Sequence, residues 1–130
     1  MPMPAATDLR AFIPARDFAL SKAFHAALGW DVRDVGPGIA LVTVGVAQHF
    51  YIQAYYLREV AENSMLHLTV DDAQAWYAHM RSVLADGRFP GARVQPPAAQ
   101  PYGAIVTFVH DPSGVLLHFC EWGSPHRAAP

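Results

Sequence analysis

The clearest pattern of apolar and polar positions lies near the end of the chain. Residues 104–109 are apolar and β-branched, and residues 115–122 then alternate, with Leu117 and Phe119 on one face and His118 on the other. Between the two segments lies an Asp-Pro-Ser-Gly sequence at 111–114, in which proline fixes φ and glycine permits a positive φ. The pattern predicts a β-hairpin with one face packed on a core and the other carrying a histidine.

Similar apolar segments predict further strands, at residues 9–15, 30–35, 39–44, 48–55, 64–70 and 93–95. Two helices are predicted after Asp17 and after Asp72, where apolar residues recur with a 3.6-residue period. Each aspartate is a good N-cap because its carboxylate accepts hydrogen bonds from free backbone amides. Gly29 and Gly87 are expected to end the two helices.

The order of these elements repeats along the chain. Each half reads as a strand, a helix and three strands, which indicates two copies of one βαβββ unit. We therefore predict an α+β fold of two tandem βαβββ units, in which curled mixed sheets enclose a concave pocket and the helices lie on the outer face. The predicted domain spans residues 8–122, with modules at 8–56 and 64–122 and flexible ends at 1–7 and 123–130.

Alternation also assigns the two faces of each sheet. In the second half, the more apolar set is expected under the helix, which leaves for the inner face Met65, His67, Thr69, His118 and Cys120. The first half leaves for the same face Arg10, Phe12, His49, Tyr51, Gln53 and Tyr55. Arg10 is the one charged residue in this set, and aromatic rings with a few polar groups are typical of small-molecule pockets. A solvated sheet face, or one buried in a dimer, is the alternative.

Composition narrows the function classes. The chain has 130 residues, the size of one domain, and a net charge of −2 without a basic stripe, so no nucleic-acid partner is expected. No apolar run is long enough to span a membrane, and the start shows no signal peptide. Cys120 is the single cysteine, which excludes an internal disulfide and suits a reducing compartment. We expect a cytoplasmic protein.

Some residues outside the alternating pattern also carry predictions. His25, on the first helix, is expected to be exposed, and His110 is expected to be a turn residue. Trp30 and Tyr102 adjoin loops with glycine, so each is expected at the edge of the cleft, where its ring can stack on a flat ligand.

Two roles are possible for His118, the inner-face histidine of the hairpin. His118 is expected to bond Thr69 or Gln53, or to contact a ligand. Cys120 shares its face, but no third group is apparent that would orient a nucleophilic Cys-His pair.

Three motifs carry a resemblance to a known family. They are Ile-Pro-Ala-Arg-Asp-Phe at 13–18, Phe-His-Ala-Ala-Leu-Gly-Trp at 24–30 and Asp-Pro-Ser-Gly-Val-Leu-Leu at 111–117. In the paired βαβββ frame, they resemble the vicinal oxygen chelate superfamily, which includes glyoxalase I, extradiol dioxygenases and bleomycin-resistance proteins. The chain is most similar to the bleomycin-resistance branch. That resemblance implies a metal-free homodimer that sequesters a small molecule in clefts at the dimer interface.

Metal-using members of this superfamily draw ligands from four inner-face positions. The resemblance places these positions at Arg10, Gln53, Met65 and His118. Arginine does not ligate metals, methionine is a poor ligand for hard divalent ions, and no carboxylate is present in the set. We therefore predict no metal and no cofactor. A shift of two residues, which puts His67 in place of Met65, keeps a metal site at His67 and His118 as the alternative.

The predicted function is metal-independent binding of a small molecule, in the manner of a resistance protein, rather than catalysis. The expected ligand-binding residues are Phe12, Trp30, His49, Tyr51, Gln53, Tyr55, His67, Tyr102 and His118. Two alternatives stay open: a metal-dependent glyoxalase-like lyase or dioxygenase that uses His67 and His118, and a structural or regulatory dimer without a small ligand.

The expected ligand of the binding protein is aromatic or largely apolar. A cation such as bleomycin needs acidic groups near the cleft, and the candidates, Asp31, Asp34, Glu59 and Glu62, are not expected on the inner strands.

Overall fold

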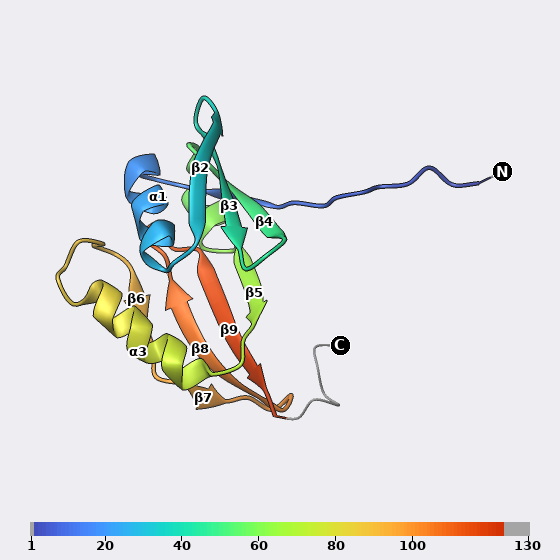
Figure 1. The fold of residues 1–130 in the computed structure, drawn as a ribbon. Coiled ribbons are helices and arrows are strands. Elements are labelled where there is room, and N and C mark those ends of the chain that lie inside the picture. Colours follow the sequence, from blue (N-terminus) through green and yellow to red (C-terminus); the bar gives the residue numbers. More distant parts are fainter. Residues whose placement is uncertain (1, 124–130) are drawn as a thin grey trace.

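The computed structural model describes residues 2–123 and confirms the α+β architecture. Two mixed sheets lie end to end, each with one helix on the same side of the molecule (Figure 1). The predictions for residue 1 and for the tail at 124–130 fall outside the described residues. No helix in residues 2–123 is long and apolar enough to cross a membrane.

The first sheet has the strand order β1-β4-β3-β2. Its strands are β1 (Phe12–Pro14), β2 (Asp31–Gly36), β3 (Ile39–Val44) and β4 (Gln48–Gln53). The strands β1 and β4 run parallel, because the helix α1 (Phe18–Ala27) crosses over after β1, whereas β4, β3 and β2 are joined by antiparallel pairing.

The second sheet repeats this plan with the order β5-β9-β8-β6. Its strands are β5 (Met65–Thr69), β6 (Arg93–Val94), β8 (Ala104–His110) and β9 (Leu116–Trp122), and β7 (Ala98–Ala99) pairs with β8. The strands β5 and β9 run parallel, and the helix α3 (Ala73–Leu84) provides the crossover. A short helix α2 (Arg58–Ala61) lies in the connection between the two modules.

Both predicted helix starts are confirmed. The Asp17 carboxylate accepts a hydrogen bond from the Leu20 amide, and the Asp72 carboxylate accepts one from the Ala75 amide, each at 3.0 Å. Each carboxylate satisfies one of the free amides in the first turn of its helix. Gly29, just beyond the end of α1, has φ +100°, a backbone conformation that favours glycine.

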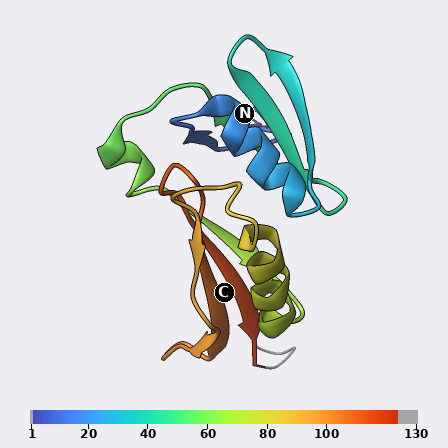
Figure 2. The same cartoon turned by 90° about the vertical axis from the view of Figure 1, so that its left-hand side faces the viewer.

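The core lies between the sheets and the two helices, and it is shared by both modules. Figure 2 shows α1 and α3 together in front of the strands. Trp30, from the first module, stacks on Phe119, from the second, with ring centroids 6.3 Å apart, and lies at the same distance from Trp76. Trp30 is only 9% exposed, so its prediction as a cleft-edge residue is wrong. Its indole fills the space between the modules, where it buries more apolar area than at a loop edge.

The strand predicted over residues 9–15 is shorter than expected. It begins at Phe12, and Leu9 is 93% exposed. Residues 2–11 form no helix or strand, and the first part of this segment extends away from the body of the molecule (Figure 1). Residues 9–11 were predicted to continue this strand, but the pairing of β1 with β4 begins at Phe12. Before Phe12, the backbone contact with β4 is the hydrogen bond that the Tyr51 amide donates to the Ala11 carbonyl.

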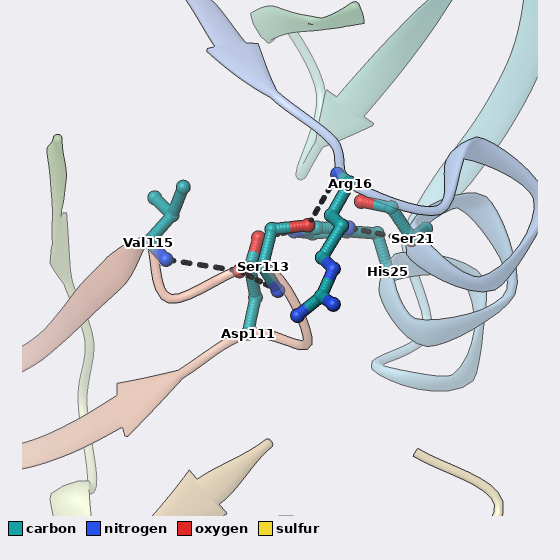
Figure 3. A network of polar contacts seen from close by, with 6 residues as sticks. All are labelled: Arg16, Ser21, His25, Asp111, Ser113 and Val115. Carbon is teal, nitrogen blue, oxygen red and sulfur yellow. Dashed lines mark hydrogen bonds and ion pairs between the residues drawn. The ribbon is translucent and has the colours of Figure 1, made fainter. Parts of the chain in front are cut away.

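The Asp111–Gly114 turn joins the second hairpin to the first module. The Asp111 carboxylate accepts hydrogen bonds from the amides of Ser113 and Val115, at 2.9 and 3.0 Å, which is the local bonding pattern that favours aspartate at a turn. The Ser113 hydroxyl accepts a bond of 2.9 Å from the Arg16 amide, just before α1 (Figure 3). The turn therefore fixes the position of one module relative to the other.

His25 lies against this turn and is fully buried, so the prediction of an exposed histidine is wrong. It lies on the side of α1 that faces the second module, where its ring packs against Phe24, Trp30 and Phe50. The position of His25 in the helix did not predict its burial. This side of α1 would face water in an isolated helix, and in the folded protein the Asp111–Gly114 turn covers it.

The ring nitrogens of His25 determine its tautomer. Nδ1 lies 2.8 Å from the carbonyl oxygen of Ser21, and because a carbonyl only accepts, Nδ1 carries a proton. The second nitrogen, Nε2, lies 3.8 Å from Oδ2 of Asp111, and neither of these two buried atoms has another partner. Burial lowers the pKa of His25 to about 4 and raises the pKa of Asp111 to about 6. Between these values the pair holds one proton, on Asp111, facing the bare Nε2 of a neutral imidazole.

Candidate functional site

The inner face is the side of both sheets that lies opposite α1 and α3. Residues directly opposite each other on neighbouring strands point to the same side of a sheet, so the strand register assigns this face. In the first module it carries Phe12, Asp31, Arg33, Leu41, Thr43, His49, Tyr51 and Gln53. In the second module it carries Met65, His67, Thr69, Arg93, Ala104, Val106, Phe108, His110, Leu116, His118, Cys120 and Trp122.

A stacked aromatic pair marks the first module. Phe12 and Tyr51 are opposite in register, with ring centroids 4.7 Å apart, and Phe12 is 51% exposed. The Arg10 guanidinium donates a 3.0 Å hydrogen bond to the Tyr51 hydroxyl and lies 5.5 Å from the centre of its ring. Asp8 forms a 2.6 Å ion pair with Arg10 from the extended N-terminal segment. These contacts hold a cationic group at the edge of an open aromatic surface.

The first inner face carries more charge than the sequence predicted. Arg33 on β2 is opposite Leu41, which is opposite Tyr51, so Arg33 shares their side. Asp31 shares it too, because it is opposite Thr43. The prediction that no acidic candidate lies on the inner strands is therefore wrong for Asp31. The error came from treating β2 in isolation, since only its pairing with β3 shows which residues face inward.

Histidines mark the inner face of the second module. His67 is directly opposite His118, and His118 is opposite Phe108 on the next strand. His110, two residues from Phe108, lies at the end of β8 and is opposite Arg93. His110 is thus an inner-face strand residue, and its prediction as a turn residue is wrong. Strand β8 extends one residue beyond the apolar segment at 104–109, so it includes His110.

The polar contacts of His67 and His118 differ from those predicted. Nε2 of His67 lies 3.3 Å from the Thr69 hydroxyl, and Nδ1 lies 3.4 Å from the Cys120 sulfur. His118 contacts neither Thr69 nor Gln53; its Nε2 lies 3.3 Å from the Met65 sulfur, a weak partner. A ligand that offers a stronger acceptor or donor can therefore replace the Met65 contact at little cost.

Burial and neighbouring cations set the protonation of this face. The pKa of His118 is lowered by burial and by His67, and the pKa of His110 is lowered by burial, Arg93 and His118. Both imidazoles are therefore neutral at pH 7 and can donate or accept hydrogen bonds. Burial raises the pKa of the Cys120 thiol, which keeps it protonated and does not favour a nucleophilic role.

A cavity of about 460 Å³ opens where the two modules meet. It is lined by Ala11, Val44, Gln48, His49, Phe50, Leu66, His67, Leu68 and Thr69. The lining combines apolar residues with the hydrogen-bonding residues Gln48, His49, His67 and Thr69, and it includes no Asp, Glu, Lys or Arg. Such a lining and volume are typical of small-molecule sites.

Of the predicted ligand-binding residues, only His49 and His67 line the cavity, and the others are spread over the two modules. Six lie on the inner face: Phe12, His49, Tyr51, Gln53, His67 and His118. Tyr55 and Tyr102 are 45% and 52% exposed, and the Tyr102 ring lies 5.9 Å from that of Trp122. Trp30 is in the core. Arg33, Arg93, Phe108 and His110 were not predicted from the sequence as inner-face residues, whereas Trp122 was placed by alternation on the same face as His118. For Phe108, the alternation within residues 104–109 was available, and continuing it by one residue past 109 also finds His110.

Arg10, Gln53, Met65 and His118, which the resemblance predicts to match metal-ligand positions, do not suit a hard divalent ion. Arg10 is held by Tyr51 and Asp8, and Met65 and His118 contact each other. Among residues 2–123, no three His, Cys, Asp or Glu side chains group in a way that could hold a metal ion. The donor set at the four predicted positions lacks a carboxylate, the ligand type that hard divalent ions favour.

Comparison with known proteins extends this description. Neither a family model nor a curated protein matches the sequence. Solved structures do match: a bleomycin resistance determinant encoded on the transposon Tn5 has a TM-score of 0.73 at 23% identity, over 92% of this chain and 100% of that one. A bleomycin-binding protein of Streptomyces verticillus, complexed with copper(II)-bleomycin, has a TM-score of 0.72 at 22% identity, over 94% and 100%. A lactoylglutathione lyase from Agrobacterium tumefaciens has a TM-score of 0.66 at 14% identity, over 91% and 95%. At these identities the likeness shows a shared fold, and the fold serves both drug-binding proteins and an enzyme.

Proposed function

We propose that this chain is a metal-independent, small-molecule-binding protein that acts by sequestration, as bleomycin-resistance proteins do, and that it works in the cytoplasm as a homodimer. The observation that carries the proposal is the cavity between the modules. The apolar residues Phe50, Leu66 and Leu68, whose side chains pack in or against the core, line it together with the hydrogen-bonding residues His49 and His67 of the inner face. A recess of this volume with a mixed lining is typical of a small-molecule site.

The arrangement supports a two-part mode of binding. The apolar body of a ligand enters the cavity, where burial of its surface drives binding. The imidazoles of His49 and His67 and the hydroxyl of Thr69 then orient its polar group. The exposed Phe12–Tyr51 pair adds a flat surface beside the cavity on which an aromatic ring can stack.

Sequestration is favoured over catalysis by the state of the reactive groups. The Cys120 thiol is buried and its pKa is raised, so it is a poor nucleophile. The superfamily metal positions carry Arg10, Gln53, Met65 and His118, which lack a carboxylate. A metal-dependent lyase or dioxygenase remains the second candidate, because His67 and His118 lie directly opposite each other on β5 and β9.

The homodimer is supported by apolar side chains left open on or beside the inner face. Phe12, Met65 and Tyr102 are each more than half exposed. A second copy that covers them would also close the cleft. Sedimentation at micromolar concentration is expected to give twice the 14.2 kDa mass of the chain, and a 14.2 kDa species under those conditions would contradict the dimer.

The proposal is tested with a neutral aromatic probe and a metal assay on the same preparation. Protein purified without chelators is expected to contain no stoichiometric zinc, nickel, manganese or iron by elemental analysis. Isothermal titration with 2-naphthamide is expected to show saturable binding, and chromatography is expected to recover the probe unchanged. Stoichiometric metal would favour the lyase or dioxygenase, and absence of any binding would overturn the proposal.

A further inference from the structure

The charged and imidazole side chains of the molecule are unevenly distributed. The chain as a whole has a net charge of −2, but its inner face carries three arginines: Arg10, Arg33 and Arg93. Within residues 2–123, the strand register places one carboxylate on this face, that of Asp31. Asp8, which pairs with Arg10, adds a second carboxylate, so three arginines stand against two carboxylates and the inner face keeps a positive excess, which favours anions there.

Histidines strengthen this bias. Four of the seven histidines lie on the inner face: His49, His67, His110 and His118. His67, His118 and His110 follow one another across β5, β9 and β8, and Arg93 on β6 adjoins the last of them. The register brings no carboxylate to the inner face of the second module. Glu121, the one acidic residue of β9, points to the helix side, where it accepts a 2.9 Å hydrogen bond from the Ala73 amide.

The existing contacts show that this face receives a carboxylate. Asp8 makes a 2.6 Å ion pair with Arg10 from a segment that belongs to no strand or helix, and its side chain is 56% exposed. At the other module, His118 has only the Met65 sulfur as a polar partner. His67 connects the two regions, because it lines the cavity and lies opposite His118.

We propose that the ligand of this cleft is an aromatic carboxylate, whose apolar body occupies the cavity and whose carboxylate bonds His67 and His118. The apolar body lies in the cavity that Phe50, Leu66 and Leu68 line, and the field of Arg93 and His110 stabilises the negative charge. This inference rests on the proposed small-molecule function and adds the chemical class of the ligand. It also separates this cleft from one built for a cationic drug, which would require acidic walls.

The test compares three probes of nearly equal shape: 2-naphthoate, the neutral 2-naphthamide and the cationic 2-naphthylmethylammonium. Isothermal titration at pH 6.5 and low salt is expected to show naphthoate binding about tenfold more tightly than the amide, and the ammonium more weakly than both. If the amide binds and naphthoate has no advantage, the ligand class is wrong while the proposed function stands. If none of the three binds, both fail.

Variants locate the carboxylate. His67→Gln and His118→Gln are each expected to weaken naphthoate about tenfold and to change amide affinity less than threefold, because glutamine keeps a hydrogen-bonding group without a charge. Arg93→Gln is expected to weaken naphthoate about threefold through the lost field. The matched control is Arg81→Gln, on the solvent side of α3, which is expected to have no effect. Equal effects of Arg81→Gln and Arg93→Gln, or loss of amide and naphthoate binding in parallel, would overturn the assignment.

Discussion

Two histidine environments in this molecule differ in almost every respect. His25 is fully buried between the modules, donates to the Ser21 carbonyl and faces the Asp111 carboxyl. His118 lies on the open inner face, with His67 beside it and a thioether as its polar partner. Burial lowers the pKa of both imidazoles, but only the ring of His25 faces a carboxyl group, that of Asp111 at 3.8 Å. A lowered histidine pKa therefore does not identify a functional site by itself; the partners of the ring distinguish a structural histidine from a ligand-facing one.

The largest effect is expected at the buried pair. Asp111→Ala removes the acceptor of the Ser113 and Val115 amides and leaves Nε2 of His25 in a cavity, so it is expected to lower the free energy of unfolding by about 3 kcal/mol or more. Urea denaturation at pH 7 measures this loss. Asp86→Ala, at an exposed turn, is the control and is expected to cost less than about 1 kcal/mol. A loss below 1 kcal/mol for Asp111→Ala would show that the pair does not hold the modules together.

The second prediction concerns the pH dependence of stability. In the folded protein the pair carries one proton between pH 4 and pH 6, on Asp111, because the pKa values are about 6 for Asp111 and about 4 for His25. In the unfolded chain the same range also has one proton on the two residues, on the histidine, because ordinary pKa values are about 3.9 and 6.5. Equal proton numbers give no slope of stability against pH. In the wild type, the His25–Asp111 pair is therefore expected to cause almost no change in the free energy of unfolding between pH 4 and pH 6.

In the variant Asp111→Asn, the lowered pKa of His25 is expected to make the free energy of unfolding depend on pH. His25 alone has a lowered pKa, so the unfolded state binds more protons between pH 4 and pH 6.5, and the stability of the variant rises with pH in that window. Relative to the wild type, the rise is expected to reach about 3 kcal/mol. Urea midpoints at pH 4, 5, 6 and 7 measure it. Parallel curves for the two proteins would contradict the assignment of the proton to Asp111.

The inner face is expected to respond to pH through its ligand. A bound carboxylate raises the pKa of neighbouring imidazoles, so naphthoate affinity is expected to increase about tenfold from pH 8 to pH 6. The titratable or charged groups involved are His67, His118, His110, Arg93 and Cys120 from the second module, and His49, Asp31, Arg33 and Arg10 from the first. Titration of 2-naphthamide over the same range provides the control and is expected to be flat. If naphthoate affinity did not change with pH, the imidazoles would not be in contact with its carboxylate.

The smallest effect is expected on stability at the inner face. His118→Gln removes a ring that contacts Phe108 and the Met65 sulfur but breaks no strong hydrogen bond. The free energy of unfolding is therefore expected to change by less than about 1 kcal/mol. Urea denaturation compares this variant with His25→Gln, whose free energy of unfolding is expected to fall by about 3 kcal/mol. Similar losses for the two variants would remove the distinction between the two environments.

The sequence predicted the fold well, because local rules and pairing agreed in most elements. Asp17 and Asp72 begin their helices as expected, and the alternation on β9 places Leu117 and Phe119 in the core. The errors arise where an element meets another element. Trp30 and His25 were predicted from their own segments, whereas their burial depends on Phe119 and Asp111, which are distant in sequence.

The candidate site was predictable only in part for the same reason. Alternation within β4, β5 and β9 was enough to place Tyr51, His67 and His118 on one face. Asp31 and Arg93 are different, because the side of Asp31 follows from the pairing of β2 with β3, and Arg93 lies in a strand of only two residues. No local periodicity identifies such positions, so the charge of the inner face became visible only through the strand register.

We expect the ligand to contact the inner-face imidazoles and not His25. Two-dimensional ¹H–¹⁵N spectra of the histidine side chains, recorded as a function of pH with and without 2-naphthoate, measure this difference. Naphthoate is expected to shift the ring signals of His67 and His118 and to raise their pKa values, while His25 keeps a neutral ring protonated at Nδ1 above pH 4. Unchanged signals for His67 and His118 at saturating naphthoate, or a response confined to His25, would contradict it.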